Sequence, residues 1–210
     1  LFKELEARNR EVTETLEQQT ATAEILRVIA SSPTDVQPGM EAVAATVVAL
    51  RDLYRQVQMV FQDSYASLNP RLPVSMTIAL PPMVHGMPRA KALAHAAELL
   101  SAVGLEPALF QNRYPHELSG GQRQRVNVAR ALALSPRLVI LDEAVSALDK
   151  SVEAHVLNLL ADLKRDFALT YVFISHDLDV VRYMSDRVLV MYLGKIVEIG
   201  PVDAIYRAPR

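Results

Sequence analysis

Apolar strands alternate with amphipathic helices over the second half of the chain, and this alternation limits the fold more than any other feature. Strands that are apolar almost throughout are typical of parallel sheets covered by helices on both faces. The pattern therefore predicts an α/β fold with a mostly parallel sheet. Strands are predicted at 138–142 (LVILD), 170–175, 187–193 and 196–200, and helices at about 120–134, 151–167 and 177–185.

The segment from residue 51 to residue 104 adds an earlier strand and a helix. VQMVF (57–61) predicts a strand that breaks at a polar loop containing Asn69 and Pro70. A Pro-rich stretch (80–88) leads to a predicted helix at about 89–103, and Gly104 is placed to cap it.

The composition is that of a globular chain and excludes several classes of function. With 210 residues, 50% of them hydrophobic, the chain can bury a sizeable core. No run of about 18 apolar residues and no signal-peptide pattern occurs, so the cytoplasm is the expected compartment. The absence of cysteine excludes disulfides and thiolate sites, and the net charge of −2 gives no reason to expect a nucleic-acid partner.

Residues 1–50 differ in character from the rest and predict a helical leader. Residues 1–30 lack Gly and Pro, which favours a long helix, and the apolar pattern resumes at 41–50. Five of the eight heptad core positions are large and apolar, which leaves two interpretations open: a short dimerising coiled coil or a solitary solvent-exposed helix. The a positions are Phe2, Asn9, Leu16 and Ala23, and the d positions are Leu5, Val12, Gln19 and Leu26.

The strand LVILD runs into two adjacent carboxylates, Asp142 and Glu143. Open α/β sheets bind ligands at the carboxyl ends of their strands, so both acids are expected at a ligand edge. Asp142 is suited to hold Mg²⁺ directly or through water. Glu143 is suited to orient a water that attacks a γ-phosphate, or to accept its proton. The alternative is a strand that happens to end in two acids.

A glycine-containing loop opens the helix at 120–134. Ser119 precedes Gly120 and Gly121, which permit close backbone approach, and the helix start directs free N–H groups at an anion. An equally good interpretation is a capped helix start, with Ser119 as the N-cap and Gln122 three residues later.

Four motifs together resemble the ATP-binding cassette ATPases of ABC transporters, over roughly residues 51–210. They are FQDSYASLNP (61–70), LSGGQRQRVNVARAL (118–132), LVILDEAVSALD (138–149) and VFISHDLDVV (172–181), and the first and third look like the oligopeptide and dipeptide importer type. The resemblance implies an ATPase that uses ATP and Mg²⁺. It also implies an incomplete P-loop-NTPase-like sheet with an inserted helical subdomain at 72–117, preceded here by the long N-terminal helix.

The resemblance assigns a role to each motif residue. Gln62 of the Q-loop senses Mg²⁺ and the attacking water, and Asp142 is the Walker B partner of the metal. Glu143 is the catalytic base and His176 is the switch histidine. The residues implied in ATP binding are Ser119, Gly120, Gly121 and Gln122 of the signature, together with Asp149 of the D-loop (147–149) at the dimer seam.

The same resemblance implies partners and a location. A second ATPase subunit would complete a homodimer or heterodimer, and integral membrane permease subunits would bind residues 72–117. The chain would then lie at the inner face of the plasma membrane. Residues 16–50 instead resemble the linker and entry helix before a GAF domain in bacterial sensor histidine kinases, without the GAF body or the phospho-accepting histidine motif.

One expected motif is missing from the 210 residues. A P-loop needs G-x-x-x-x-G-K-[ST], and only Gly194 among the seven glycines is followed by Lys. The missing part would supply a strand and a helix, so an exposed sheet edge is expected.

The missing P-loop leaves three hypotheses about function. In the first, the chain is a fused or truncated importer ATPase with little activity alone. In the second, it is a half-site that lends its signature loop to an intact ATPase. In the third, it is a non-enzymatic coiled-coil module for signalling or assembly.

Overall fold

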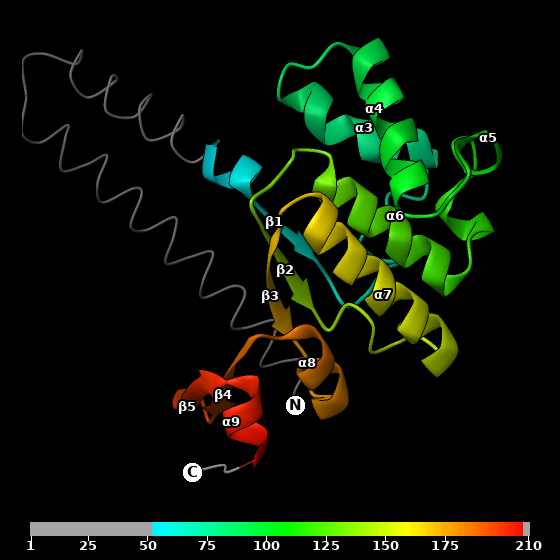
Figure 1. The fold of residues 1–210 in the computed structure, drawn as a ribbon. Helices are drawn as coiled ribbons and strands as arrows, with labels where there is room; N and C mark the ends of the chain where they lie inside the picture. The colour runs from blue at the N-terminus through cyan, green and yellow to red at the C-terminus, as the bar shows by residue number, and fades with distance from the viewer. Residues whose placement is uncertain (1–51, 208–210) are drawn as a thin grey trace, which may run out of the picture. The chain divides into compact units, whose positions relative to one another are not determined.

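The computed structural model describes residues 52–207, and Figure 1 shows their arrangement. Contacts within the chain divide it into two units, and the second unit begins at Arg55. The predicted coiled coil at 1–30, the apolar segment 41–50 and the expected domain boundary at residues 50 and 51 lie outside the described residues.

Three parallel strands form the central sheet of the second unit. They are β1 (Val57–Val60), β2 (Leu138–Asp142) and β3 (Thr170–Ile174), in the order β1-β2-β3. Ile140 of β2 lies opposite Met59 of β1 and Val172 of β3. The predicted α/β fold with a parallel sheet is confirmed, and the bounds of β2 are those read from the sequence.

Two long helices cover one face of this sheet, α6 (Gly120–Leu132) and α7 (Lys150–Asp166) (Figure 1). The apolar residues of α7 recur at helical spacing, and Val156, Leu160 and Leu163 are buried. They join Val139 and Leu141 of β2 in one core cluster. Burial of this amphipathic stripe therefore holds the helices to the sheet.

Helices also fill the range predicted for the helical subdomain, residues 72–117. They are α3 (Val74–Val84), α4 (Arg89–Ala102), α5 (Pro107–Phe110) and the 3₁₀ helix η1 (Pro115–Glu117). The two ends of this range are joined by backbone hydrogen bonds, because Val74 N–H donates to Arg113 O (2.9 Å) and Ser75 N–H donates to Gln111 O (3.0 Å). The insertion therefore leaves and rejoins the sheet layer at one place.

Helix α4 ends one residue earlier than the sequence predicts. Val103, rather than Gly104, is the C-cap, and Gly104 follows with a φ of +70°. Gly104 N–H donates to Ser101 O (3.0 Å) and Leu105 N–H donates to Leu100 O (2.9 Å), the two bonds of a Schellman motif. Only a residue without a Cβ adopts this φ without strain.

The sequence pattern does not predict helix α3, because Pro81 and Pro82 lie inside it. Prolines usually break helices by removing a donor and by crowding the preceding turn. Here both lie in the final turns, and Ile78, Ala79 and Pro82 are buried. Burial of this side of α3 offsets the two lost hydrogen bonds.

The C-terminal part departs from the expected covered sheet. It contains α8 (Leu178–Met184), β4 (Arg187–Tyr192), β5 (Lys195–Pro201) and α9 (Val202–Arg207). Strands β4 and β5 form a separate antiparallel hairpin, and β3 stays at an edge of the three-stranded sheet. Val172 and Ile174 of β3 are 45% and 46% exposed, so coverage of both faces is wrong for β3. Within residues 52–207, no strand pairs with the outer side of β3, and whether this is the edge expected from the missing P-loop strand stays a prediction.

An ion pair joins the start of α7 to the start of α8. Lys150 Nζ lies 2.8 Å from Asp177 Oδ2 and 3.0 Å from Glu153 Oε1. Asp177 also caps α8, because its Oδ1 accepts from the N–H groups of Asp179 and Val180. The hydrogen bond from Lys150, followed by the backbone N–H of Val180, holds the pKa of Asp177 below its usual value.

We expect Gly121→Ala and Gly120→Ala to change stability in opposite directions. A Cβ at Gly121 would lie 2.5 Å from Val152 Cγ1, whereas a Cβ at Gly120 would meet its nearest neighbour, Leu148 Cδ2, at 3.6 Å. Overpacking should cost about 1–3 kcal/mol at Gly121, and reduced backbone freedom should add about 0.5–1 kcal/mol of stability at Gly120. Urea unfolding measures both. Val152→Ala should partly restore Gly121→Ala, and equal effects of the two glycine variants would contradict this packing.

We expect Asp177→Asn to lower stability at neutral pH and to matter less in acid. Asn still caps the helix but cannot pair with Lys150. A carboxyl whose folded pKa is lowered contributes stability above its unfolded pKa, and this contribution is lost as pH falls through the folded pKa. The difference in urea midpoint between the two proteins should therefore shrink below about pH 5. A difference that stays constant or grows in acid would contradict this role of the carboxylate.

Candidate functional site

The carboxyl end of β2 places the two predicted acids. Asp142 is the last residue of the strand, and Glu143 N–H donates to Ile174 O (2.9 Å), which continues the pairing with β3. Glu143 has a φ of +46°, a strained conformation for a residue with a side chain. Ser146 fixes it, because its Oγ and N–H both donate to Glu143 O (2.9 and 3.1 Å). Strain of this kind concentrates at functional sites.

Three of the sequence-predicted residues meet at this point. Gln62 Nε2 donates to Glu143 Oε2 (2.7 Å), and His176 Nδ1 lies 3.1 Å from Glu143 Oε1. Both oxygens of Glu143 are thereby oriented, although the three residues follow three different strands. The Glu143 side chain is 29% exposed and that of His176 is 72% exposed, so a reactant can reach the group from solvent. An oriented, accessible carboxylate of this kind can hold a water or accept its proton.

The signature loop lies elsewhere, at the start of α6. Ser119 Oγ accepts from Gln122 N–H (3.3 Å) and Gln122 Oε1 accepts from Ser119 N–H (2.9 Å), which is the predicted capping box. These bonds stay within the loop. The other N–H groups of a helix start have no partner inside the helix, so they can still meet an anion from outside.

The signature loop instead lies against the D-loop and the first turn of α7. The close approaches of Gly120 to Leu148 and of Gly121 to Val152 define this contact. Asp149 is the N-cap of α7 by backbone position, but its side chain makes no capping hydrogen bond. The structure therefore forms two groups, one around Glu143 and one around the signature and D-loop.

Polar contacts between α6 and the Q-loop have no counterpart in the sequence-predicted site. Asn127 Nδ2 donates to Ser64 O (3.1 Å), Arg130 Nη1 donates to Ser67 O, and the Arg123 guanidinium lies 5.5 Å from the centre of the Tyr65 ring. The sequence does carry a signal for these contacts. Arg123, Asn127 and Arg130 are polar residues at positions i, i+4 and i+7 of α6, which places them on one side of the helix. Burial lowers the pKa of Arg130.

The Q-loop has its own internal support as well. Asp63 Oδ1 accepts from Tyr65 N–H (2.8 Å) and Ala66 N–H (3.0 Å), and these bonds lower the pKa of Asp63. The Lys150–Asp177 pair supports the residue after His176 in the same way. No sequence spacing pointed to either, since both depend on which loops the fold brings together.

The oxygen-bearing side chains near Glu143 fit Mg²⁺ in part, but the chain offers few groups that could bind a triphosphate. Asp142 and Gln62 offer oxygen atoms, the ligands that Mg²⁺ prefers, and this metal commonly takes the rest from phosphate and water. Among residues 52–207 no group of three His, Asp or Glu side chains is arranged to hold a metal by itself. Without a G-x-x-x-x-G-K-[ST] loop, the chain supplies no cradle for the phosphates.

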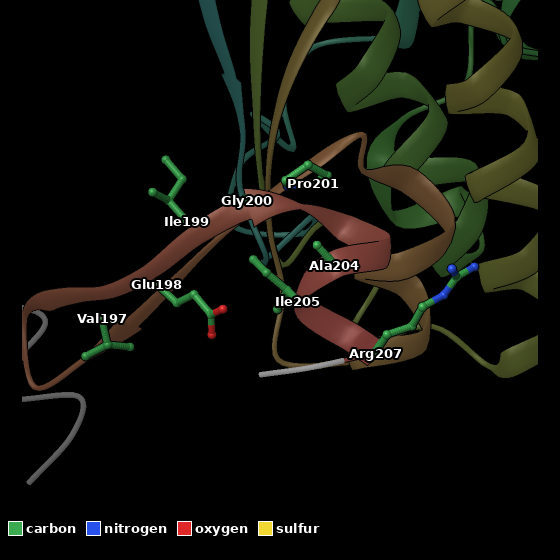
Figure 2. A pocket seen from close by; sticks show the side chains of 8 residues that line it. All are labelled: Val197, Glu198, Ile199, Gly200, Pro201, Ala204, Ile205 and Arg207. Atoms are coloured by element: carbon green, nitrogen blue, oxygen red, sulfur yellow. The ribbon is translucent and has the colours of Figure 1, made fainter. Parts of the chain in front are cut away.

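A hollow of about 620 Å³ lies between β5 and α9, and neither the Glu143 group nor the signature loop lines it (Figure 2). Val197, Glu198, Ile199, Gly200, Pro201, Ala204, Ile205 and Arg207 line it. None of them is a sequence-predicted site residue. Among residues 52–207 no helix is both long and apolar enough to cross a bilayer.

Relatives of this chain are found by sequence. It is 55% identical over 163 residues to the glutathione import ATP-binding protein GsiA of Pectobacterium atrosepticum, which covers 77% of this chain and 26% of that protein. The GsiA protein of Escherichia coli K12 is 55% identical over 162 residues, with the same coverage. The chain therefore spans about a quarter of the length of these relatives.

A solved structure and a family model agree with these relatives. The structure of cbiO1 from Clostridium perfringens, part of the ABC transporter complex cbiONQ, matches with a TM-score of 0.68 and 26% identity, over 74% of this chain and 61% of that one. The ABC transporter family model matches residues 14–146, which include the segment 16–50 that resembles a sensor-kinase linker. The chain therefore belongs to the ABC transporter family.

Proposed function

We propose that this chain carries the water-activating half of a transporter ATPase site. The arrangement of Glu143 between Gln62 and His176 is the observation that supports this most. Glu143 is the base that accepts a proton from the attacking water, and His176 and Gln62 orient its carboxylate. Bound ATP would supply the phosphoryl group, with Mg²⁺ held near Asp142 neutralising its charge.

In a complete assembly the hydrolysis drives import of a small peptide across a membrane. Two relatives that are 55% identical are glutathione importers by name, and glutathione is a tripeptide. The chain would lie at the inner face of the plasma membrane, bound to permease subunits through residues 72–117. Exposed apolar side chains on this subdomain, Leu80, Val84 and Leu109 among them, favour such a contact.

The coiled-coil module is a third hypothesis that stays a prediction, since residues 1–30 lie outside the described part of the chain.

A half-site role is the second candidate function, and the separation between the group around Glu143 and the group around the signature loop favours it. Ser119, Gly120 and Gly121 lie at a helix start beside the D-loop, and the capping bonds and glycine contacts described for this loop do not include Glu143. A partner that owns a P-loop could therefore use them.

We expect the purified chain to hydrolyse ATP at background rate. One missing anion-stabilising donor already costs about 100-fold or more in rate, and the chain lacks the whole phosphate cradle. A phosphate-release assay with Mg-ATP measures the rate, and Glu143→Gln is the matched variant because it keeps the shape of the side chain. Equal background from both proteins is expected. Turnover that Glu143→Gln removes would contradict the expectation.

We expect the chain to rescue an intact ABC ATPase whose own signature serine is replaced by arginine. Its signature loop should restore the lost anion contacts and raise the ATPase rate by at least about tenfold. Chain carrying Ser119→Arg should not rescue, whereas chain carrying Glu143→Gln should, since the nucleotide lies on the partner's P-loop. No rescue, or rescue that survives Ser119→Arg, would remove the half-site hypothesis.

A further inference from the structure

The direction of the His176 side chain depends on the backbone that carries it. The side chain is 72% exposed, and its Nδ1 reaches Glu143 Oε1 across 3.1 Å. So exposed an imidazole has few neighbouring side chains to hold it by packing. The groups that fix residues 175–178 therefore decide whether the imidazole meets the carboxylate.

Two hydrogen bonds fix the residue that follows His176. Asp177 N–H donates to Ser175 Oγ (3.0 Å), just beyond the end of β3. Its carboxylate accepts from Lys150 Nζ (2.8 Å), at the start of α7. Asp177 is thereby held from β3 and from α7.

A third contact comes from the C-terminal helix, α9. The hydroxyl of Tyr206 donates to Leu178 O, in the first turn of α8 (Figure 1). The Arg182 guanidinium lies 5.7 Å from the centre of the Tyr206 ring, within the range of a cation–π contact. Leu178 and Arg182 are four residues apart and lie on one side of α8. Tyr206 therefore contacts α8 along one turn, directly after His176.

Helix α9 is itself attached to two other elements. Ile205 is 9% exposed, and a Cβ placed at Gly200 of β5 would lie 3.6 Å from its Cγ1. Val202 N–H donates to Asp186 O (3.2 Å), and the Asp186 carboxylate accepts from Lys164 Nζ of α7 (2.9 Å). The hydroxyl that α9 presents to α8 therefore comes from a base joined to both β5 and α7.

A second tyrosine makes a similar contact at the other end of α8. The hydroxyl of Tyr183 donates to Asn158 Oδ1 of α7 (2.7 Å). Tyr183 is the last residue but one of α8, whereas Leu178 is the first. Each tyrosine hydroxyl thus joins α8 to a neighbouring helix, but only that of Tyr206 does so beside His176.

We propose that Tyr206 is a positioning residue for His176: its hydroxyl fixes the first turn of α8 and so keeps the imidazole against Glu143. The proposal rests on the proposed function, because it concerns the bond between His176 and Glu143. It goes beyond that function because α9, which carries none of the sequence-predicted site residues, then takes part in building the site.

The test observes the His176 ring by nitrogen NMR of the full chain labelled at histidine. At about pH 8.5, two units above the ordinary imidazole pKa of about 6.5, a neutral ring beside a carboxylate keeps its proton on the nitrogen that faces it. The chain has five histidines, and loss of one signal in His176→Gln assigns the ring. Glu143→Ala removes the carboxylate and gives the nitrogen shifts of the unbonded ring.

We expect Tyr206→Phe to move the His176 nitrogen shifts toward those of Glu143→Ala. Loss of one hydrogen bond of this kind changes an equilibrium by about twofold to tenfold, so the ratio of bonded to unbonded ring should fall by that factor. Amide exchange at Asp179 and Val180, in the first turn of α8, should become faster by a similar factor. Unchanged nitrogen shifts or unchanged exchange overturns the proposal.

Tyr183→Phe is the matched control. It also removes one hydroxyl hydrogen bond from α8, so a general loss of stability would affect both phenylalanine variants alike. We expect it to leave the His176 shifts and the exchange at Asp179 as they are in the unaltered chain. Thermal unfolding of each variant checks that it folds. Equal movement of the His176 shifts in the two variants overturns the proposal.

Failure of this proposal and failure of the proposed function give different results. If the unaltered chain and Glu143→Ala have the same His176 shifts, His176 does not orient Glu143, and that part of the proposed function is overturned together with the role of Tyr206. If those shifts differ but Tyr206→Phe leaves them unchanged, only the role of Tyr206 is overturned. The measurement uses no nucleotide, so it does not depend on the rate at which the chain hydrolyses ATP.

Discussion

The pairing of β2 with β3 is the constraint on which the site depends. Because the strands are parallel and in register, Asp142 lies opposite Ile174, and the chain leaves both strands at the same edge. The hydrogen bond from Glu143 N–H to Ile174 O extends this pairing by one residue, and Glu143 has a positive φ at this point. From this position its carboxylate reaches His176 beyond β3 and Gln62 beyond β1. A slip of register would separate all three.

Helix α6 makes contacts of different chemistry at its two ends. Its first turn packs against α7 through Gly121, which leaves no space for a side chain. Its later turns hold the Q-loop by side-chain donors, Asn127 and Arg130, aimed at backbone carbonyls. Helix α6 therefore contacts both the first turn of α7 and the loop that follows Gln62.

Much of the fold was predictable because local signals agree. LVILD gave β2 residue for residue, and the spacing of apolar residues gave α6 and α7 to within two residues at each end. Gly104 ended α4 for a reason visible in the sequence, its tolerance of positive φ. Helix α3 was not predicted, because its prolines outweigh its apolar residues in any local reading.

Candidate site residues could be named from the sequence, whereas the contacts that support them could not. Glu143 and His176 were readable as candidates from their places after strands, whereas the anchors Asn127 and Lys150 depend on loops far away in sequence. The exposure of one sheet residue and the burial of another were also invisible locally. Ile174 and Leu141 look alike as strand residues, but the register places them on opposite faces of the sheet, and α6 and α7 cover the face of Leu141.

Within residues 52–207 the outer edge of β3 is unpaired, and the lifetime of the protein in a cell depends on what covers this edge. An apolar strand with one free side is a target for aggregation and for quality-control proteases, and both act faster on chains that wait longer uncovered. The amount of chain that survives then follows the amount of whatever covers the edge, by mass action.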